Sequence, residues 1–318
     1  MQNSDSQTAA QRTGNILIDI ASQFFLAVVV GLVMAVVANT FVEGARWFLS
    51  ASRTDSLLAL TIAGTSYNLD ILLTLSGAAV LILIVRRVLG ITIWSGPADS
   101  IYAVQQSREP LDVRQGMGST LAAFFAASGG GSVGQYGPLV HFGATITEVL
   151  LKYIRIKIDR RVFIACGVAG AISAGFNAPI AGVLFAHEAL LRRISIGAIA
   201  PIAVASIVAY AANQAFFTIE PTFSVPAMPI ELQPLIPFLV MTAFLSAGTA
   251  IAYMAAIRKG RELAGRSKWS MPALMFSCVL VVGGIGVFLP DVTGLGLSQV
   301  NQMIDGHFAL GMLVLLLI

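Results

Sequence analysis

The chain has 318 residues, of which 57% are hydrophobic and only 11% are charged, with a net charge of +3. A soluble globular domain has about 25% charged residues, so these few charges could not cover the surface of a soluble protein of this size. The composition excludes a cytoplasmic globular enzyme, gives no basis for nucleic-acid binding, and indicates a polytopic, all-α membrane protein.

The intervals between charged residues predict the membrane segments. Charge-free windows cover residues 20–42, 71–85, 115–147, 162–187, 194–219, 232–257 and 269–290. A spanning helix needs about 20 apolar residues, and several windows have that length. The second window is short, and the third is too long for one helix and is broken by glycine. We therefore expect tilted and partly penetrating helices, because irregular backbone at membrane depth is tolerated only inside protein or beside a wet cavity.

The two ends of the chain carry separate expectations. Residues 1–15 are mostly polar and are expected to form a cytoplasmic N-terminal tail. Basic residues cluster between Arg86 and Lys268, and almost none lie in 217–257, so the positive-inside rule places the clusters in the cytoplasm. Only 13 residues follow Asp305, too few to cross a bilayer. We therefore expect residues 16–318 to form a transmembrane domain that is truncated at its C-terminal end.

Three predicted helix starts at membrane depth are the candidate binding groups of the chain. They are Ser95-Gly96-Pro97, the stretch 134–138 (Gly-Gln-Tyr-Gly-Pro) and the stretch 176–179 (Phe-Asn-Ala-Pro). A helix N-terminus exposes unpaired N–H groups and about half a positive charge, which favours anions. Several such ends aimed at one point could hold an anion without a fixed cation, and release it more easily than a cation would. The alternative is that each is an ordinary helix start, with the Ser95 hydroxyl as the N-cap.

Enzymatic and metal chemistry find no support in the sequence. His187-Glu188 begins like a zinc-protease HExxH motif, but Leu191 stands where the second histidine would be. Cys166 and Cys278 lie in apolar runs and are expected to be small core residues. The three histidines (His141, His187 and His307) have no convincing nucleophile beside them. We expect no enzymatic activity, no metal and no cofactor.

Two further features of the sequence lead to predictions. His141 lies one helical turn beyond Gly137, where it could line the vestibule, relay a proton to Tyr136 or cap a neighbouring carbonyl. A row of small residues (Gly167, Ala171 and Gly175) recurs every four positions and predicts close helix packing.

Two motifs carry a family resemblance. Residues 134–141 (Gly-Gln-Tyr-Gly-Pro-Leu-Val-His) and 170–185, with Trp94 to Asp99 upstream, resemble the CLC family of voltage-gated chloride channels and chloride/proton antiporters. The resemblance implies a CLC-type bundle of tilted helices with an inverted repeat, whose second half is incomplete here. It also implies a homodimer with one anion path per subunit, in the lipid bilayer of a bacterial inner membrane.

The resemblance assigns the site residue by residue. Ser95 matches the family's pore serine, whose hydroxyl points at the central anion, and Gly96 matches the glycine after it. Gly137, Pro138 and the amides after Tyr136 match the helix start that faces the outer anion site. One departure is that the proline after Gly96 stands one position earlier than in the family.

Tyr136 occupies the position of the family's gating glutamate. A phenol is uncharged at neutral pH, so it can donate a hydrogen bond to an anion but cannot compete with one as a carboxylate does. The family's second proton-carrying carboxylate aligns with Ala189, and Glu148 lies about three turns into its helix, too far to replace the gate. The sequence therefore favours uncoupled, channel-like movement of chloride or a similar monovalent anion. The alternatives are a proton-coupled antiporter that uses another carboxylate, and a non-conducting membrane scaffold or partner subunit.

Overall fold

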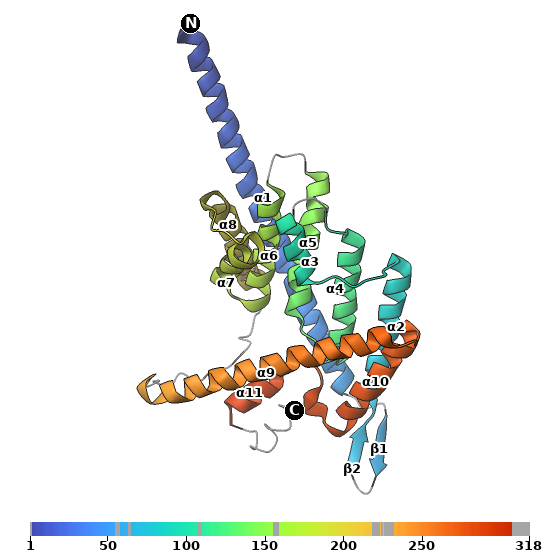
Figure 1. The fold of residues 1–318 in the computed structure, drawn as a ribbon. Helices are drawn as coiled ribbons and strands as arrows, with labels where there is room; N and C mark the ends of the chain where they lie inside the picture. Colours follow the sequence, from blue (N-terminus) through green and yellow to red (C-terminus); the bar gives the residue numbers. More distant parts are fainter. Residues whose placement is uncertain are drawn as a thin grey trace. The chain divides into compact units, whose positions relative to one another are not determined.

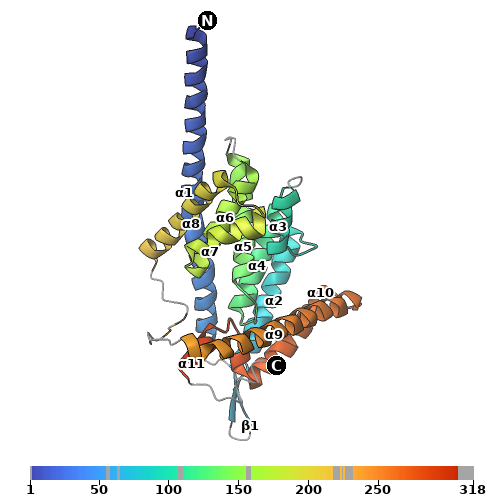
Figure 2. The same cartoon turned by 60° about the vertical axis from the view of Figure 1, so that its left-hand side comes forward.

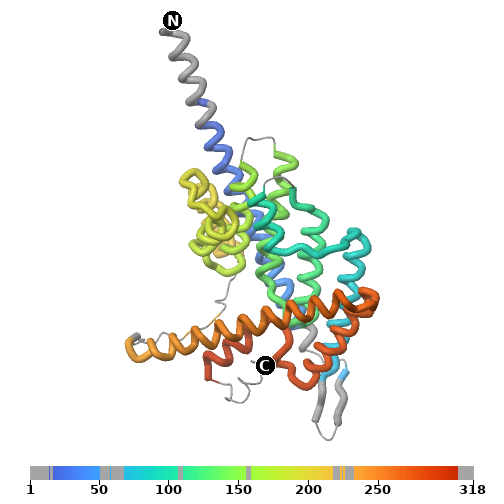
Figure 3. Tube along the Cα trace, in the orientation of Figure 1, coloured from blue at the N-terminus to red at the C-terminus, as the bar shows by residue number. Residues whose placement is uncertain are grey.

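The computed structural model describes residues 2–54, 58–62, 65–106, 110–154, 159–217, 223, 225 and 232–306. These residues are almost entirely helical (Figure 1). Two compact units are present, one made of Met1–Glu220 with Val282–Gly296 and the other of Pro221–Val281 with Leu297–Ile318. Figure 3 traces the chain from blue at the N-terminus to red at the C-terminus.

The first unit holds most of the helices. They are α1 (Gln2–Thr54), α2 (Asp70–Leu89), α3 (Pro97–Gln106), α4 (Val113–Ser128), α5 (Tyr136–Tyr153), α6 (Arg160–Phe176), α7 (Pro179–Phe185) and α8 (Ile196–Phe216). A π-helical segment, Ala186–Leu191, continues α7. A short antiparallel pair, β1 (Ala59–Ile62) and β2 (Thr65–Asn68), joins α1 to α2.

The remaining helices lie C-terminal to α8 in the sequence. They are α9 (Leu232–Arg266), α10 (Met271–Phe288) and α11 (Leu297–Ile304), with a 3-10 turn at Pro290–Val292. The division between the units falls inside α10, so only its last residues belong to the first unit.

Five helices in the described part are long and apolar enough to cross a membrane: α1 over Leu17–Ser50, α2, α8, α9 over Gln233–Arg266, and α10. By contrast, α3 has 10 residues and α7 has 7. At 1.5 Å per residue neither can span a hydrocarbon layer of about 30 Å. The expected mixture of spanning and partly penetrating helices is confirmed.

Helix α6 lies at the centre of the first unit, between α5 on one side and α1 and α8 on the other (Figure 2). Every residue from Phe163 to Ala174 is buried. Small residues make this possible. A Cβ at Gly143 would lie 2.6 Å from the Gly167 carbonyl oxygen, and a Cβ at Gly175 would lie 2.7 Å from Leu139. The predicted packing role of Gly167, Ala171 and Gly175 is confirmed.

The predicted breaks coincide with helix ends. The long window 115–147 divides into α4 and α5 around the glycine-rich stretch 129–134. Asn177 ends α6 in the left-handed conformation, with φ of 58°, and Pro179 begins α7. The Ser206 hydroxyl donates to the Pro179 carbonyl, and the Ser173 hydroxyl donates to the Ser206 carbonyl. These bonds fix α7 against α6 and α8.

Some features differ from expectation. The strand pair at residues 59–68 was not predicted, and the window 71–85 belongs to a 20-residue helix rather than a short one. From Gln2 onward the expected N-terminal tail is continuous with α1. His307 lies outside the described residues.

Candidate functional site

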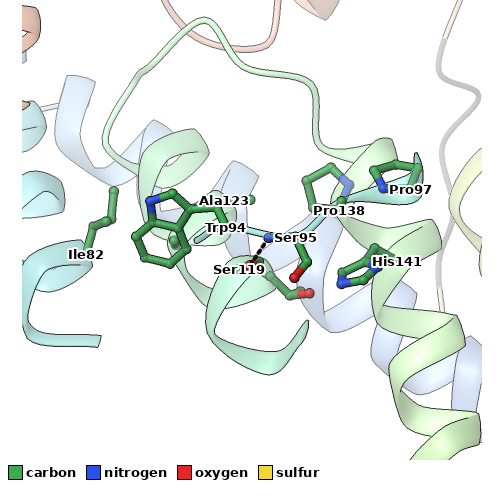
Figure 4. Close-up of a pocket in the computed structure, with 11 residues that line it drawn as sticks. Ile82, Trp94, Ser95, Pro97, Ser119, Ala123, Pro138 and His141 are labelled. Atoms are coloured by element: carbon green, nitrogen blue, oxygen red, sulfur yellow. Dashed lines mark hydrogen bonds between the residues drawn. The ribbon is translucent and has the colours of Figure 1, made fainter. Parts of the chain in front are cut away.

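Two cavities lie around the start of α3. The first has a volume of about 300 Å³ and is lined by Ile82, Trp94, Ser95, Gly96, Pro97, Ser119, Thr120, Ala122, Ala123, Pro138 and His141 (Figure 4). The second has a volume of about 410 Å³ and extends along α3 to the start of α4. Its lining is Ile93, Trp94, Ser95, Asp99, Tyr102, Ala103, Gln106, Pro110, Leu111, Asp112, Gln115 and His141.

Trp94, Ser95 and His141 line both cavities, so the two spaces meet at these side chains. Figure 4 shows Ser95 and His141 beside Pro138. Neither lining includes a lysine or an arginine. That the anion path has no fixed cation stays a prediction.

The start of α3 differs from the predicted cap. The Gly96 amide donates to Asp99 Oδ2 at 2.7 Å, and α3 begins at Pro97, so the Asp99 carboxylate, three residues on, caps this helix. The prediction that the Ser95 hydroxyl is the N-cap was wrong. The Ser95 amide donates to Ser119 Oγ at 2.8 Å. Both amides are thus engaged, and the Ser95 hydroxyl makes no hydrogen bond within the described part of the chain.

The start of α5 lies beside the start of α3. A Cβ at Gly137 would lie 3.4 Å from Pro97 Cγ, and Pro138 lines the first cavity. The amides of Tyr136 and Gly137 have no acceptor among the described residues. Two helix N-termini therefore meet at the first cavity, and the start of α5 has amide donors without an acceptor among the described residues.

The Tyr136 ring stacks on Phe176, with centroids 3.9 Å apart and planes at 25°. This contact ties the start of α5 to the end of α6. Tyr136 is not among the residues that line either cavity. Its role as the gate stays a prediction.

His141 is 1% exposed and forms a hydrogen bond between Nδ1 and Ser100 Oγ at 2.6 Å. Its Nε2 has no hydrogen-bond partner among the described residues. The predicted carbonyl contact is absent from the described hydrogen bonds of this ring, and no hydrogen bond there joins it to Tyr136. The proton relay stays a prediction.

Two carboxylates lie in the second cavity. Asp99 accepts from the Gly96 amide, and Asp112 Oδ1 accepts from the amides of Arg114 and Gln115 at 2.9 and 3.3 Å. Each caps a helix, α3 or α4, so the positive end of that helix offsets part of its charge.

Glu148, which is buried, forms an ion pair with the half-buried Arg160. The Arg160 Nη2 to Glu148 Oε2 distance is 2.8 Å, and Nε lies 3.1 Å from both carboxylate oxygens. Arg160 also donates to the Ala103 carbonyl in α3 at 3.4 Å. The pair joins α5, α6 and α3, and it lies in none of the cavity linings described above.

The His187-Glu188 pair lies in the π-helical segment. Glu188 is exposed, and His187 Nδ1 lies 3.3 Å from the Val183 carbonyl oxygen one turn earlier. Gln105 of α3 donates to the Ala189 carbonyl at 3.3 Å. The position of the family's second proton carrier thus contacts α3 through its backbone.

Sequence reasoning missed Ser100 and Ser119, which support His141 and Ser95 from other helices. No local pattern could have found them, because the partners are 41 and 24 residues apart. The Asp99 cap could have been found, since an acidic residue at the third helical position is a common N-terminal signal.

Comparison with known proteins gives a consistent result. The sequence model described as voltage gated chloride channel matches residues 77–318. The H(+)/Cl(-) exchange transporter ClcA of Vibrio vulnificus strain YJ016 is 27% identical over 319 residues, which is 93% of this chain and 65% of that protein. The voltage-gated ClC-type chloride channel ClcB of Yersinia pestis is 24% identical over 57% of this chain and 45% of that protein. The chain thus spans about half to two thirds of the length of these relatives.

Solved structures show the same fold. A CLC-type fluoride/proton antiporter superposes with a TM-score of 0.70 at 19% identity, covering 89% of this chain and 69% of that one. A slow cyanobacterial Cl-/H+ antiporter superposes with a TM-score of 0.72 at 16% identity, covering 92% and 70%. The predicted all-α, CLC-type fold is confirmed.

Proposed function

The chain belongs to the voltage gated chloride channel family, and from this we propose that it moves chloride or a similar monovalent anion across a membrane, through the two cavities that meet at Ser95 and His141. The chain is a multi-pass membrane protein, because it belongs to this family and has five apolar helices in its described part that are long enough to span a membrane. The transported ion would be the substrate, and no cofactor takes part.

One observation carries the proposal. Two cavities share a lining of Ser95 and His141, and the N-termini of α3 and α5 begin beside them. Free amides at the start of α5 and a free serine hydroxyl are donors, and none of them carries a full charge. Such donors bind an anion and release it without breaking a strong ion pair.

Uncoupled transport is the version that the residues favour. A neutral phenol at position 136 does not load and release protons near neutral pH, and Ala189 offers no carboxylate. We propose Tyr136 as the gate, acting through its stacking on Phe176: a change in that stacking would move the start of α5 and its free amides.

Proton-coupled exchange is the second candidate, and one observation favours it. The second cavity contains both Asp99 and His141, the kind of titratable groups that could carry protons beside the anion. In this version, the proposed relay from His141 would run through Asp99 rather than through the stacked Tyr136 ring.

A homodimer with one path in each subunit is part of the proposal, since the family resemblance implies it. Chemical cross-linking of the full-length protein in membranes tests it, with a band of twice the monomer mass expected. A protein that remains monomeric at all cross-linker concentrations would contradict this part.

The test of function is anion efflux from liposomes that hold the full-length protein, with external chloride and pH recorded together. Uncoupled transport predicts chloride efflux that requires a potassium ionophore to balance charge and moves no protons. Exchange predicts that a chloride gradient drives protons uphill. Absence of chloride flux above that of protein-free liposomes would contradict both versions and favour a non-conducting scaffold.

A further inference from the structure

We propose that His141 is a direct ligand of the transported anion, donating its Nε2–H where the two cavities meet. The proposal rests on the proposed function and assigns one more donor to the same path. It follows from three features of this side chain: its burial, its single hydrogen bond and its place in both cavity linings.

The hydrogen bond to Ser100 determines which ring nitrogen carries the proton. A serine hydroxyl has one proton to donate, and Ser100 is fully buried. Within the described part of the chain His141 Nδ1 is the only group that the Ser100 hydroxyl binds, at 2.6 Å. If Nδ1 carried the proton, the Ser100 hydroxyl proton would have no acceptor, which is costly at a buried site. Ser100 therefore donates to Nδ1, and the neutral ring carries its proton on Nε2.

The Nε2–H group is then a buried donor without an acceptor. It makes no hydrogen bond among the described residues, although the side chain is only 1% exposed. Buried donors are almost always satisfied by protein, water or a ligand. His141 is among the residues that line both cavities, and the missing acceptor is therefore assigned to the space that they share.

An anion fits this position better than a cation does. A protonated ring nitrogen has no lone pair to offer a cation. The Ser95 hydroxyl lines the same two cavities and has a proton to donate. Together with the free amides at the start of α5, these groups form a set of neutral donors. One halide can accept hydrogen bonds from several of these donors at once. Water could satisfy the same donors only if several water molecules fitted into the space.

Ser100 acts as a positioning residue in this scheme. It comes from α3, while His141 comes from α5, so the bond links the two helices that begin beside the first cavity. It holds the ring in place and fixes the tautomer that donates. Ser100 itself lines neither cavity.

The experiment measures chloride binding to the purified full-length protein by calorimetry, for the wild type and a matched set of variants. His141→Gln keeps a donor near the position of Nε2. His141→Asn keeps a polar group near Nδ1, within reach of Ser100, and removes the group at Nε2. We expect the chloride dissociation constant to rise about tenfold in His141→Asn and to stay within about threefold of wild type in His141→Gln.

A second measurement, made on the wild type, keeps the proposal testable if a His141 variant misfolds. It also tests the role of Ser100. In ¹⁵N-histidine NMR spectra of the wild type, the His141 signals should show a protonated Nε2 and an unprotonated Nδ1. Chloride addition should shift the Nε2–H proton. Ser100→Ala should produce a mixture of the two tautomers, an effect that loss of packing alone would not cause.

The outcomes separate this inference from the proposed function. If the wild type binds no chloride, the proposed function fails. If it binds chloride and His141→Asn binds equally well, His141 is not a ligand and the inference is overturned. The same conclusion follows if chloride leaves the His141 Nε2–H signal unchanged, since water then fills the position.

Discussion

In the proposed path, Ser95 and His141 would attract an anion without carrying charge. Both residues line the two cavities that meet there, while nearby carboxylates are occupied in capping helices. Neutral donors give moderate binding, because a hydrogen bond contributes about 1 kcal/mol net, whereas an unscreened ion pair at membrane depth would be far stronger. Moderate binding is what conduction requires.

Ser95→Ala should weaken chloride binding by about 1 kcal/mol, roughly fivefold in the dissociation constant, because one hydroxyl donor is lost. Ser128→Ala is the matched control. The Ser128 hydroxyl is buried and has no partner among the described residues, but it lines a separate apolar cavity of about 300 Å³. Calorimetric titration of both variants checks the prediction. Equal affinities for the two variants would remove Ser95 from the site.

Asp99→Asn should strengthen chloride binding about threefold to tenfold, because it removes a negative charge from the second cavity. The asparagine side-chain oxygen can still accept the hydrogen bond from the Gly96 amide, so the cap of α3 is kept. Chloride affinity and the thermal midpoint are measured together. An unchanged or weaker affinity with an unchanged midpoint would show that Asp99 does not face the anion.

Tyr136→Glu should introduce a competing carboxylate and make the anion flux sensitive to acid pH. We expect slow flux at neutral pH and faster flux as the glutamate is protonated, measured in liposomes between about pH 4 and pH 8. Tyr136→Phe is the control, since it keeps the ring that stacks on Phe176 and adds no carboxylate. Flux in Tyr136→Glu that is as independent of pH as in the control would contradict the gate assignment.

At the scale of helices, the packing of α5 against α6 positions the site. Gly143 and Gly167 allow their backbones to touch, and the Glu148–Arg160 pair fastens both helices to α3. The starts of α3 and α5 can then lie side by side. Backbone contact of this kind is sensitive to a single methyl group.

Gly167→Ala should lower the free energy of unfolding by about 1–3 kcal/mol, because its Cβ would lie 2.5 Å from the Gly143 carbonyl oxygen. Gly77→Ala in α2 is the control, since a Cβ there meets nothing within 4 Å. Thermal unfolding in detergent compares the two. A Gly167→Ala midpoint at or above that of the control would show that the contact is not tight.

Much of the helical plan was predictable, and the reasons are local. Glycine and proline placed the breaks at 129–138 and 176–179, because they limit which backbone conformations can continue a helix. The lengths of the apolar windows indicated the membrane spans. The strand pair at 59–68 and the π-helical segment depend on surroundings that no local pattern records.

The site was predictable only in part. Ser95, Gly137 and Pro138 could be named from motif resemblance, and the structure brings their helix starts together. The Gly96 amide is already used by Asp99, so its role as an anion donor does not follow from its position. The tautomer of His141 depends on Ser100, 41 residues away, and only the folded arrangement of α3 and α5 reveals it.

At the scale of the whole molecule, composition and function follow from the same physics. Only 11% of the residues are charged, and the described linings of both cavities at the start of α3 contain no lysine or arginine. On the proposed path, an anion would be held by dipoles and hydrogen-bond donors. Dipoles and neutral donors, in place of a fixed cation, are the central claim of the proposed function.

The most direct test is the position of bromide in crystals of the full-length protein, located by its anomalous scattering. We expect a bromide peak within hydrogen-bond distance of Ser95 Oγ and His141 Nε2, displaced when chloride is added. A peak coordinated instead by a lysine or arginine side chain, with none between Ser95 and His141, would contradict the claim.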